Sequence, residues 1–219
     1  MTAPALPRLC LVTDRRRLGA RTHQAALLAL EAQCEEGLAA GIELVLLREP
    51  DLDARPYVTL ATGLVARSAG TSTSIMVNDR ADVARASGAG VHLKSDGPPA
   101  TRLRAFMGEA ATIGRSAHDA GEIAGEHDVD YWLFGTVFPS GSKPAGWTAS
   151  GEEALAAAVR EAGAPLLAIG GVTVATAGAC RVAGAAGVAG IEIFLPRGTS
   201  PGALGPAAAA RALREAWTQ

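Results

Sequence analysis

Eight short apolar runs, separated by longer stretches with helical spacing, constrain the fold of this chain more than any other feature. They occupy residues 9–13, 42–48, 74–78, 90–93, 111–116, 131–135, 165–171 and 187–195. Each run is continuous rather than alternating, so both faces of each expected strand should be buried, as in a parallel sheet. Eight strand-helix units at roughly 25 residues each are typical of a (β/α)8 barrel.

Helical spacing fills most of the intervals between these runs. In residues 22–40, Ala26, Leu30, Cys34 and Leu38 recur at steps of four, which places them on one helix face. Similar patterns cover residues 53–69, 80–87, 151–162, 173–183 and 203–217. We therefore expect helices between successive strands, with right-handed parallel crossovers.

The predicted fold is a single TIM-barrel domain that covers residues 1–219. An open doubly wound α/β sheet is the alternative, and eight units without a GxGxxG motif after the first run weaken it. No linker or change of composition divides the chain. Since the loops after the strands form the active site of a barrel, polar residues in those loops are the candidates for function.

Composition excludes several classes of partner. The formal net charge of −2 and the aromatic content of 4% argue against nucleic acid and against an acidic membrane surface. Three cysteines without CxxC spacing argue against a disulfide framework or a zinc cluster. No signal-like segment begins the chain, and no stretch approaches the roughly 20 apolar residues of a membrane helix. We expect a cytoplasmic protein.

The strongest local signal is the pair Gly170-Gly171 at the end of the seventh run. Glycines let backbone N–H groups approach an anion, and the helix that follows adds partial positive charge. Barrels commonly bind phosphate with the loops after the seventh and eighth strands. The pair therefore predicts a phosphate site, and the alternative is a tight turn into the helix.

Polar side chains follow the third, fourth and sixth runs as well. Ser140, Ser142 and Lys143 can bind an anion through two hydroxyls and an ammonium, and the alternative is a solvated loop. Asp79 can cap the next helix. With Asp96 as a second ligand, it can instead hold Mg²⁺.

Five motifs, in order along the chain, resemble the thiamine-phosphate synthase and TenI superfamily. They are VLLRE (45–49), VNDRADVA (77–84), GRSAHD (114–119), FGTVFPSGSKP (134–144) and AIGGV (168–172). The resemblance runs from Leu11 to Phe194. It implies a homodimeric barrel whose partner is a small phosphorylated thiazole.

The resemblance also implies site residues. Those for the substrate are Arg48, Asn78, Ser116, Ser140, Ser142 and Lys143, and those for its phosphate are Gly170, Gly171, Glu192 and Ile193. Glu192 departs from the family pattern, which usually has a small residue such as serine there. A carboxylate at this position would repel a phosphate dianion unless its side chain turns away.

Two activities occur in this superfamily. The synthase joins a pyrimidine diphosphate to a thiazole phosphate and releases pyrophosphate with the help of Mg²⁺. The TenI-type enzyme shifts a proton within a thiazole carboxylate phosphate. The synthase pattern Gln-x-Arg-x-Lys after the second strand is matched only at Arg48, because Leu46 and Pro50 replace the other two residues. Residues 94–97, KSDG, replace the usual Gly-Gln and two acids after the fourth strand.

His118 decides our preference between these activities. Proton transfer at carbon suits an imidazole, whose pKa lies near neutrality. The resemblance places the catalytic histidine at His118, with Ser116 positioning the substrate. The alternative is that His118 starts a helix and bonds a backbone carbonyl.

We therefore predict a TenI-like thiazole tautomerase without a cofactor. Two alternatives remain open. One is a divergent thiamine-phosphate synthase that uses Mg²⁺, and the other is a non-catalytic regulator that binds a phosphorylated ligand.

Overall fold

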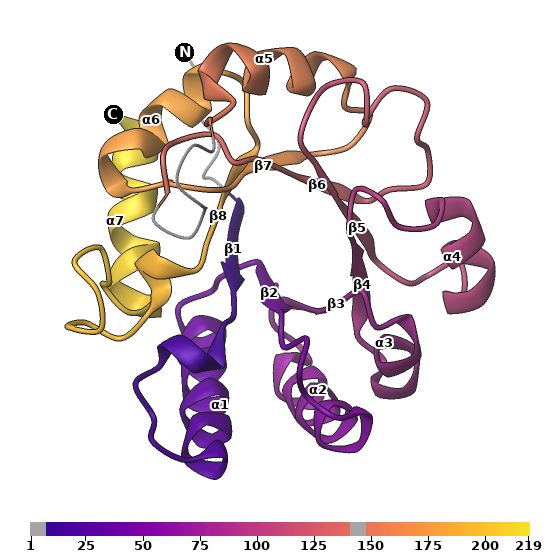
Figure 1. Cartoon of the computed structure of the whole chain (residues 1–219), viewed down its shortest axis with the longest axis vertical. Helices are drawn as coiled ribbons and strands as arrows, with labels where there is room; N and C mark the ends of the chain where they lie inside the picture. The colour runs from indigo at the N-terminus through magenta and orange to yellow at the C-terminus, as the bar shows by residue number, and fades with distance from the viewer. Residues whose placement is uncertain (1–7, 141–147) are drawn as a thin grey trace.

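A closed barrel of eight parallel strands, surrounded by helices, forms the protein (Figure 1). The structure is a computed structural model that describes residues 8–140 and 148–219. Each strand pairs with the next, and β8 pairs with β1 to close the ring. The strands are β1 (Arg8–Val12), β2 (Leu44–Leu47), β3 (Ser74–Asn78), β4 (Gly90–Leu93), β5 (Ile113–Ala117), β6 (Tyr131–Phe134), β7 (Leu166–Ala168) and β8 (Gly187–Gly190). The predicted TIM barrel is confirmed, and the open sheet is wrong.

Helices follow all the strands except β5 within the described residues. They are α1 (His23–Ala39), α2 (Ala54–Ser68), α3 (Ala81–Ser87), α4 (Ala100–Met107), α5 (Gly151–Glu161), α6 (Val174–Val182) and α7 (Pro206–Thr218). Two short 3-10 helices, η1 (Arg15–Arg17) and η2 (Glu192–Phe194), follow β1 and β8. In the described part of the chain, no helix has the length and hydropathy that a membrane span requires.

The connection between β5 and β6 differs from the predicted alternation of strands and helices. Figure 1 shows coil there, and residues 120–126 form turns closed by the bond from the Ile123 N–H to the Ala120 carbonyl, 3.2 Å. Ile123 is the one buried side chain between residues 118 and 130. A single apolar residue cannot form the apolar stripe that stabilises a helix against a sheet.

The eighth strand is shorter than predicted. It ends at Gly190, and the rest of the predicted strand, up to residue 195, contains η2. Ile193 and Phe194 are buried in the layer between the sheet and the helices, and the Phe194 carbonyl accepts a hydrogen bond from the Gln33 side chain at 2.9 Å. This apolar run is therefore buried by packing beyond the strand, which periodicity alone cannot distinguish from a longer strand.

Two apolar clusters make the core, and strand alternation separates them. Successive side chains of a strand point to opposite faces, so one set fills the barrel interior and the other packs under the helices. The interior set is Cys10, Val12, Leu44, Leu46, Met76, Tyr131, Leu133, Leu167 and Ala189. Gly114 belongs to the same layer, because a Cβ there would lie 2.1 Å from Cζ of Tyr131. The missing side chain thus makes room for the tyrosine ring.

Barrel closure depends on a close approach between β8 and β1. A Cβ added at Gly187 would lie 1.9 Å from the Arg8 carbonyl oxygen, and that backbone atom is fixed by the pairing of the two strands. We predict that Gly187→Ala lowers the free energy of unfolding by about 3 kcal/mol, because overpacking a fixed site forces the backbone apart. Urea unfolding followed by circular dichroism measures the change.

Gly163→Ala is the matched control, since a Cβ there has no heavy atom within 4 Å. It should leave the unfolding free energy nearly unchanged or raise it slightly, because alanine reduces the entropy of the unfolded chain. Equal stabilities of the two variants would contradict the proposed constraint.

Candidate active site

The carboxyl ends of β2, β3 and β5 bring predicted residues to one mouth of the barrel. Arg48, Asn78 and Ser116 each lie two residues beyond a residue of the interior layer, and His118 lies four beyond one. Alternation along a strand therefore directs them toward the barrel axis at its carboxyl end. This is the end at which barrel enzymes build their active sites.

A buried polar relay lies directly beneath Ser116. The two ring nitrogens of His92 contact the Tyr131 hydroxyl at 3.0 Å and the Ser116 hydroxyl at 2.9 Å. The His92 ring is also stacked on Tyr131, with centroids 5.4 Å apart. Burial lowers the pKa of His92 to about 3 and raises the pKa of Tyr131 well above its usual range. At neutral pH both groups are uncharged.

The neutral state of His92 determines what the relay can do. A neutral imidazole has one N–H and one lone pair, so one hydroxyl donates to the ring and the other accepts from it. The relay fixes the rotamer of Ser116 from below and holds the serine oxygen at the mouth. His92 and Tyr131 were missed as site residues, because a histidine inside an apolar run gives no sign of its partners.

His118 is exposed just after β5 and combines features of both interpretations of its role. Its ring Nδ1 contacts the Gly135 carbonyl oxygen, and its backbone N–H donates to Glu122 Oε2 at 2.7 Å. Since a carbonyl only accepts, Nδ1 carries a hydrogen, and in the neutral tautomer Nε2 then has the lone pair. The ring does bond a backbone carbonyl, but no helix starts here, and Nε2 can still accept a proton.

Arg115, between the inward positions Gly114 and Ser116, has a structural role instead. It is buried, and its guanidinium donates to the carbonyls of Ser95, Gly97 and Pro98 at 2.8 to 2.9 Å. It also pairs with Glu126 at 3.0 Å. Arg115 thereby holds the loop after β4 against the turns after β5.

Asp79 is not the cap of α3. Arg80 occupies the N-cap position without a side-chain capping bond, and Asp79 has a left-handed φ of 58°. Its carboxylate accepts hydrogen bonds from the backbone N–H of Lys94 (3.0 Å) and from the Asn78 amide (3.0 Å), and it pairs with the Lys94 ammonium (2.9 Å). A non-glycine residue in this conformation is uncommon and is held here by its surroundings.

These contacts bear on the predicted Mg²⁺ site. A carboxylate has about four acceptor positions, and those of Asp79 receive three donors, one of them a full positive charge. Asp96 is exposed in the loop after β4 and takes no part in these bonds. The side chains as arranged do not fit a divalent cation at Asp79.

Gly170 and Gly171, in the loop after β7, pack closely against the loop after β6. Both have positive φ, 90° and 66°. A Cβ at Gly170 would lie 2.5 Å from Cγ2 of Thr136, and one at Gly171 would lie 2.4 Å from the Pro139 carbonyl. The tight turn therefore accounts for both glycines by itself, and phosphate binding there stays a prediction.

The Glu192 carboxylate has partners outside the glycine pair. Its carboxylate pairs with Arg17 at 3.4 Å and lies beside Gly202. Ile193, next to it, is buried. Of the loop after β6, Ser140 is half-buried and interacts with another residue, whereas Ser142 and Lys143 lie outside the described residues.

A buried ionic network holds the ends of β1 and β2 together. Glu49 accepts from the Thr13 hydroxyl and from Arg15, both at 2.7 Å, and Arg15 also pairs with Asp51 at 2.8 Å. Thr13 in turn accepts the backbone N–H of Arg48 at 3.0 Å. The network thereby fixes where Arg48 leaves the strand.

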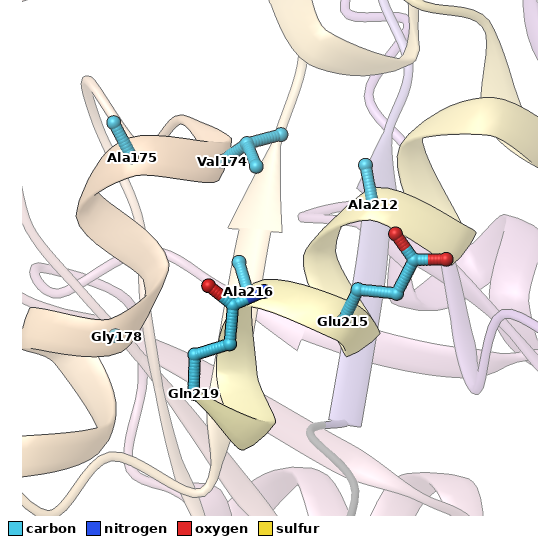
Figure 2. Close-up of a pocket in the computed structure, with 7 residues that line it drawn as sticks. All are labelled: Val174, Ala175, Gly178, Ala212, Glu215, Ala216 and Gln219. Atoms are coloured by element: carbon cyan, nitrogen blue, oxygen red, sulfur yellow. The ribbon is translucent and has the colours of Figure 1, made fainter.

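Two surface hollows lie away from this mouth. One of about 420 Å³ lies between α6 and α7, where Figure 2 shows Gly178 facing Ala216, with Glu215 as its one ionisable side chain. Another of about 140 Å³ involves Trp132 and residues that precede β6 and β7, at the opposite end of the barrel. Neither contains a predicted site residue.

Comparisons with known proteins agree on one family. The family model described as thiamine monophosphate synthase matches residues 9–194. A putative thiamine-phosphate synthase of Geobacter sulfurreducens is 38% identical over 190 residues, which cover 85% of this chain and 86% of the relative. The thiamine-phosphate synthase of Chlorobium luteolum is 34% identical over 195 residues, covering 88% and 87%.

Solved structures of similar fold include one whose name belongs to the same family. A thiamine phosphate pyrophosphorylase from Pyrococcus furiosus has a TM-score of 0.77 at 25% identity and covers 96% of this chain and 95% of its own. A 3-hexulose-6-phosphate synthase, with a TM-score of 0.65 at 20% identity and coverages of 95% and 99%, shares the fold.

The buried His92 predicts a specific pH dependence of stability. Its folded pKa of about 3 lies below the ordinary 6.5, so between these values the unfolded chain takes up a proton that the folded chain does not. This contribution is complete above pH 6.5 and is lost as the pH falls toward 3. From pH 7.5 to 5.0 it amounts to about 2 kcal/mol.

Urea unfolding at these two pH values tests the prediction. His92→Gln should remove about 2 kcal/mol of the pH-dependent loss, because glutamine does not titrate. His23→Gln makes the same change at an exposed position and should keep the wild-type difference. A His92→Gln protein with the wild-type pH dependence would rule out a neutral buried imidazole.

Proposed function

The chain belongs to the thiamine monophosphate synthase family, and from this premise we propose that it is a thiamine-phosphate synthase. The proposed reaction joins a pyrimidine diphosphate to a thiazole phosphate and releases pyrophosphate. The observation that carries the proposal is the similarity, at 34–38% identity over most of both chains, to relatives named as synthases. This ranks the synthase above the tautomerase that we favoured from the motifs.

The geometry supports the proposal at the mouth of the barrel. Arg48 and Lys94 supply positive charge beside Asn78, and a diphosphate needs cations and hydrogen-bond donors there. Ser116 offers a hydroxyl whose position is fixed by His92. We assign these residues to the pyrimidine diphosphate.

The thiazole phosphate is assigned to the opposite side of the mouth. Gly170 and Gly171 lie in the loop that leads to α6, and backbone N–H groups before a helix suit a phosphate. The pairing of Glu192 with Arg17 reduces the repulsion that an isolated carboxylate would exert. Ser140, Ser142 and Lys143 complete the proposed substrate contacts.

One observation keeps the tautomerase as a second candidate. When the His118 ring is neutral, the bond from Nδ1 to Gly135 leaves a lone pair on Nε2, and this exposed atom has no partner among residues 8–140 and 148–219. Such an atom can take a proton from carbon. The tautomerase needs no cofactor, and its substrate is a thiazole carboxylate phosphate.

The synthase proposal is tested by one assay and one variant. Purified protein with the pyrimidine diphosphate, the thiazole phosphate and excess Mg²⁺ should form thiamine phosphate and pyrophosphate, measured by chromatography and by phosphate release after pyrophosphatase treatment. Arg48→Gln should lower kcat/KM by about 10- to 100-fold, because a charged hydrogen bond contributes about 1.5–3 kcal/mol.

Arg102→Gln removes the same charge from an exposed position on α4 and should keep the wild-type rate. Absence of product with the wild-type protein would refute the synthase. Binding of thiazole phosphate without turnover in either assay would favour the non-catalytic regulator.

The tautomerase candidate makes a separate prediction for His118. His118→Ala should abolish isomerisation of the thiazole carboxylate phosphate, followed by ultraviolet absorbance, because the base is lost. Binding of that substrate should persist in calorimetry. Isomerisation that is absent from the wild type, or retained by the variant, would eliminate this candidate.

A further inference from the structure

Three neighbouring strands bring two cations and an amide to one sector of the barrel mouth. Arg48 follows β2, Asn78 ends β3 and Lys94 follows β4. In the strand register Leu46 lies opposite Met76, and Asn78 lies opposite His92. Continuing this register beyond β2 and β4 places Arg48 level with Asn78, and Lys94 two residues farther out. All three have the inward parity of their strands.

Asp79 anchors this group. Its backbone N–H donates to the His92 carbonyl at 2.8 Å, so the residue is tied to the end of β4. Its carboxylate then accepts from Lys94 twice, once from the backbone and once from the ammonium, and from Asn78. Because Arg115 holds the carbonyls of the same loop, the backbone of Lys94 is fixed from both sides.

The Lys94 ammonium is held in place and still has N–H donors for a ligand. An ammonium has three N–H donors, and among the described residues Asp79 receives one of them. The Lys94 side chain is 65% exposed, whereas that of Asp79 is 27% exposed. The ammonium therefore covers the carboxylate and presents its remaining donors to solvent at the mouth.

Arg48 and Lys94 bring two cations to the same side of the mouth, because β2 and β4 both pair with β3 and each cation follows the end of its strand. A ligand with two adjacent phosphate groups can relieve the repulsion between these cations.

We propose that Lys94 is a built-in cation that binds the diphosphate group of the substrate, in place of a divalent metal ion on Asp79. This rests on the proposed function for the identity of the ligand. A metal ion at Asp79 would have to displace the ammonium, and the donors already on the carboxylate leave it little free coordination. The Lys94 side chain thus supplies the positive charge that a metal ion bound to Asp79 would otherwise provide.

Pyrophosphate binding tests the proposal without turnover. Isothermal calorimetry in EDTA should detect inorganic pyrophosphate binding to the wild-type chain. Lys94→Gln should weaken this binding about tenfold or more, because one charge-assisted contact is lost. Lys94→Arg should stay within about threefold of wild type, because the charge is kept. Arg102→Gln, the control for net charge, should bind like the wild type.

A second titration in excess Mg²⁺ tests the substitution for a metal. The ligand is the same for both proteins, so the affinity ratio between wild type and Lys94→Gln reports on the site. This ratio should be smaller in Mg²⁺ than in EDTA, because removal of the ammonium lets Asp79 bind Mg²⁺. A ratio unchanged by Mg²⁺, a wild-type protein that binds pyrophosphate only with Mg²⁺, or equal affinities in EDTA would overturn the proposal.

The outcome is separable from that of the synthase assay, which contains excess Mg²⁺. Product formation together with equal pyrophosphate affinities in EDTA would sink the role of Lys94 and keep the synthase. Lys94-dependent binding without product would refute the synthase and keep the cation site. Thermal unfolding of each variant confirms that the exposed substitutions leave the fold intact.

Discussion

Closure of the strands into a ring is the constraint on which the rest of the structure depends. Each strand is buried on both faces, so its backbone groups find partners only on neighbouring strands, and the pairing of β8 with β1 removes the last open edge. Closure also makes alternate side chains converge on one axis. A small interior results, filled by apolar residues and by one polar relay, and all strand ends open at a common mouth.

Several polar groups around this mouth are held in pairs, and for the buried ones a low-dielectric interior requires a partner. The neutral His92 ring lies between two hydroxyls, and Glu49 forms an ion pair with Arg15. Asp79 is paired with Lys94, and Glu192 with Arg17. These pairings orient the residues that face a ligand. The ligand specificity of the site therefore also depends on side chains that do not contact the ligand.

Family membership and local geometry contribute different parts of the functional argument. Similarity to the relatives along the whole barrel supports the proposed synthase reaction. The residues after β2 and β4, however, differ from the synthase motifs at these positions. Pro50 stands where a lysine is expected, and Lys94 supplies a cation from another strand. Loops after different strands of a barrel can supply the same positive charge, because all the strand ends share one mouth.

The sequence by itself determined the barrel, the places of its eight strands and the loops in which to look. Continuous apolar runs and helical spacing are local signals of burial, and they placed Gly170-Gly171 and His118 at the ends of strands. The expected catalytic role of His118 came from the resemblance to the family. Tertiary structure decided the pairing of Asp79 with Lys94, the relay from Tyr131 to Ser116 and the turn of Glu192 toward Arg17. It also replaced a helix after β5 with turns and the end of β8 with η2. Residues 15 to 175 positions apart make these contacts, and local periodicity carries no information about which distant side chains will meet.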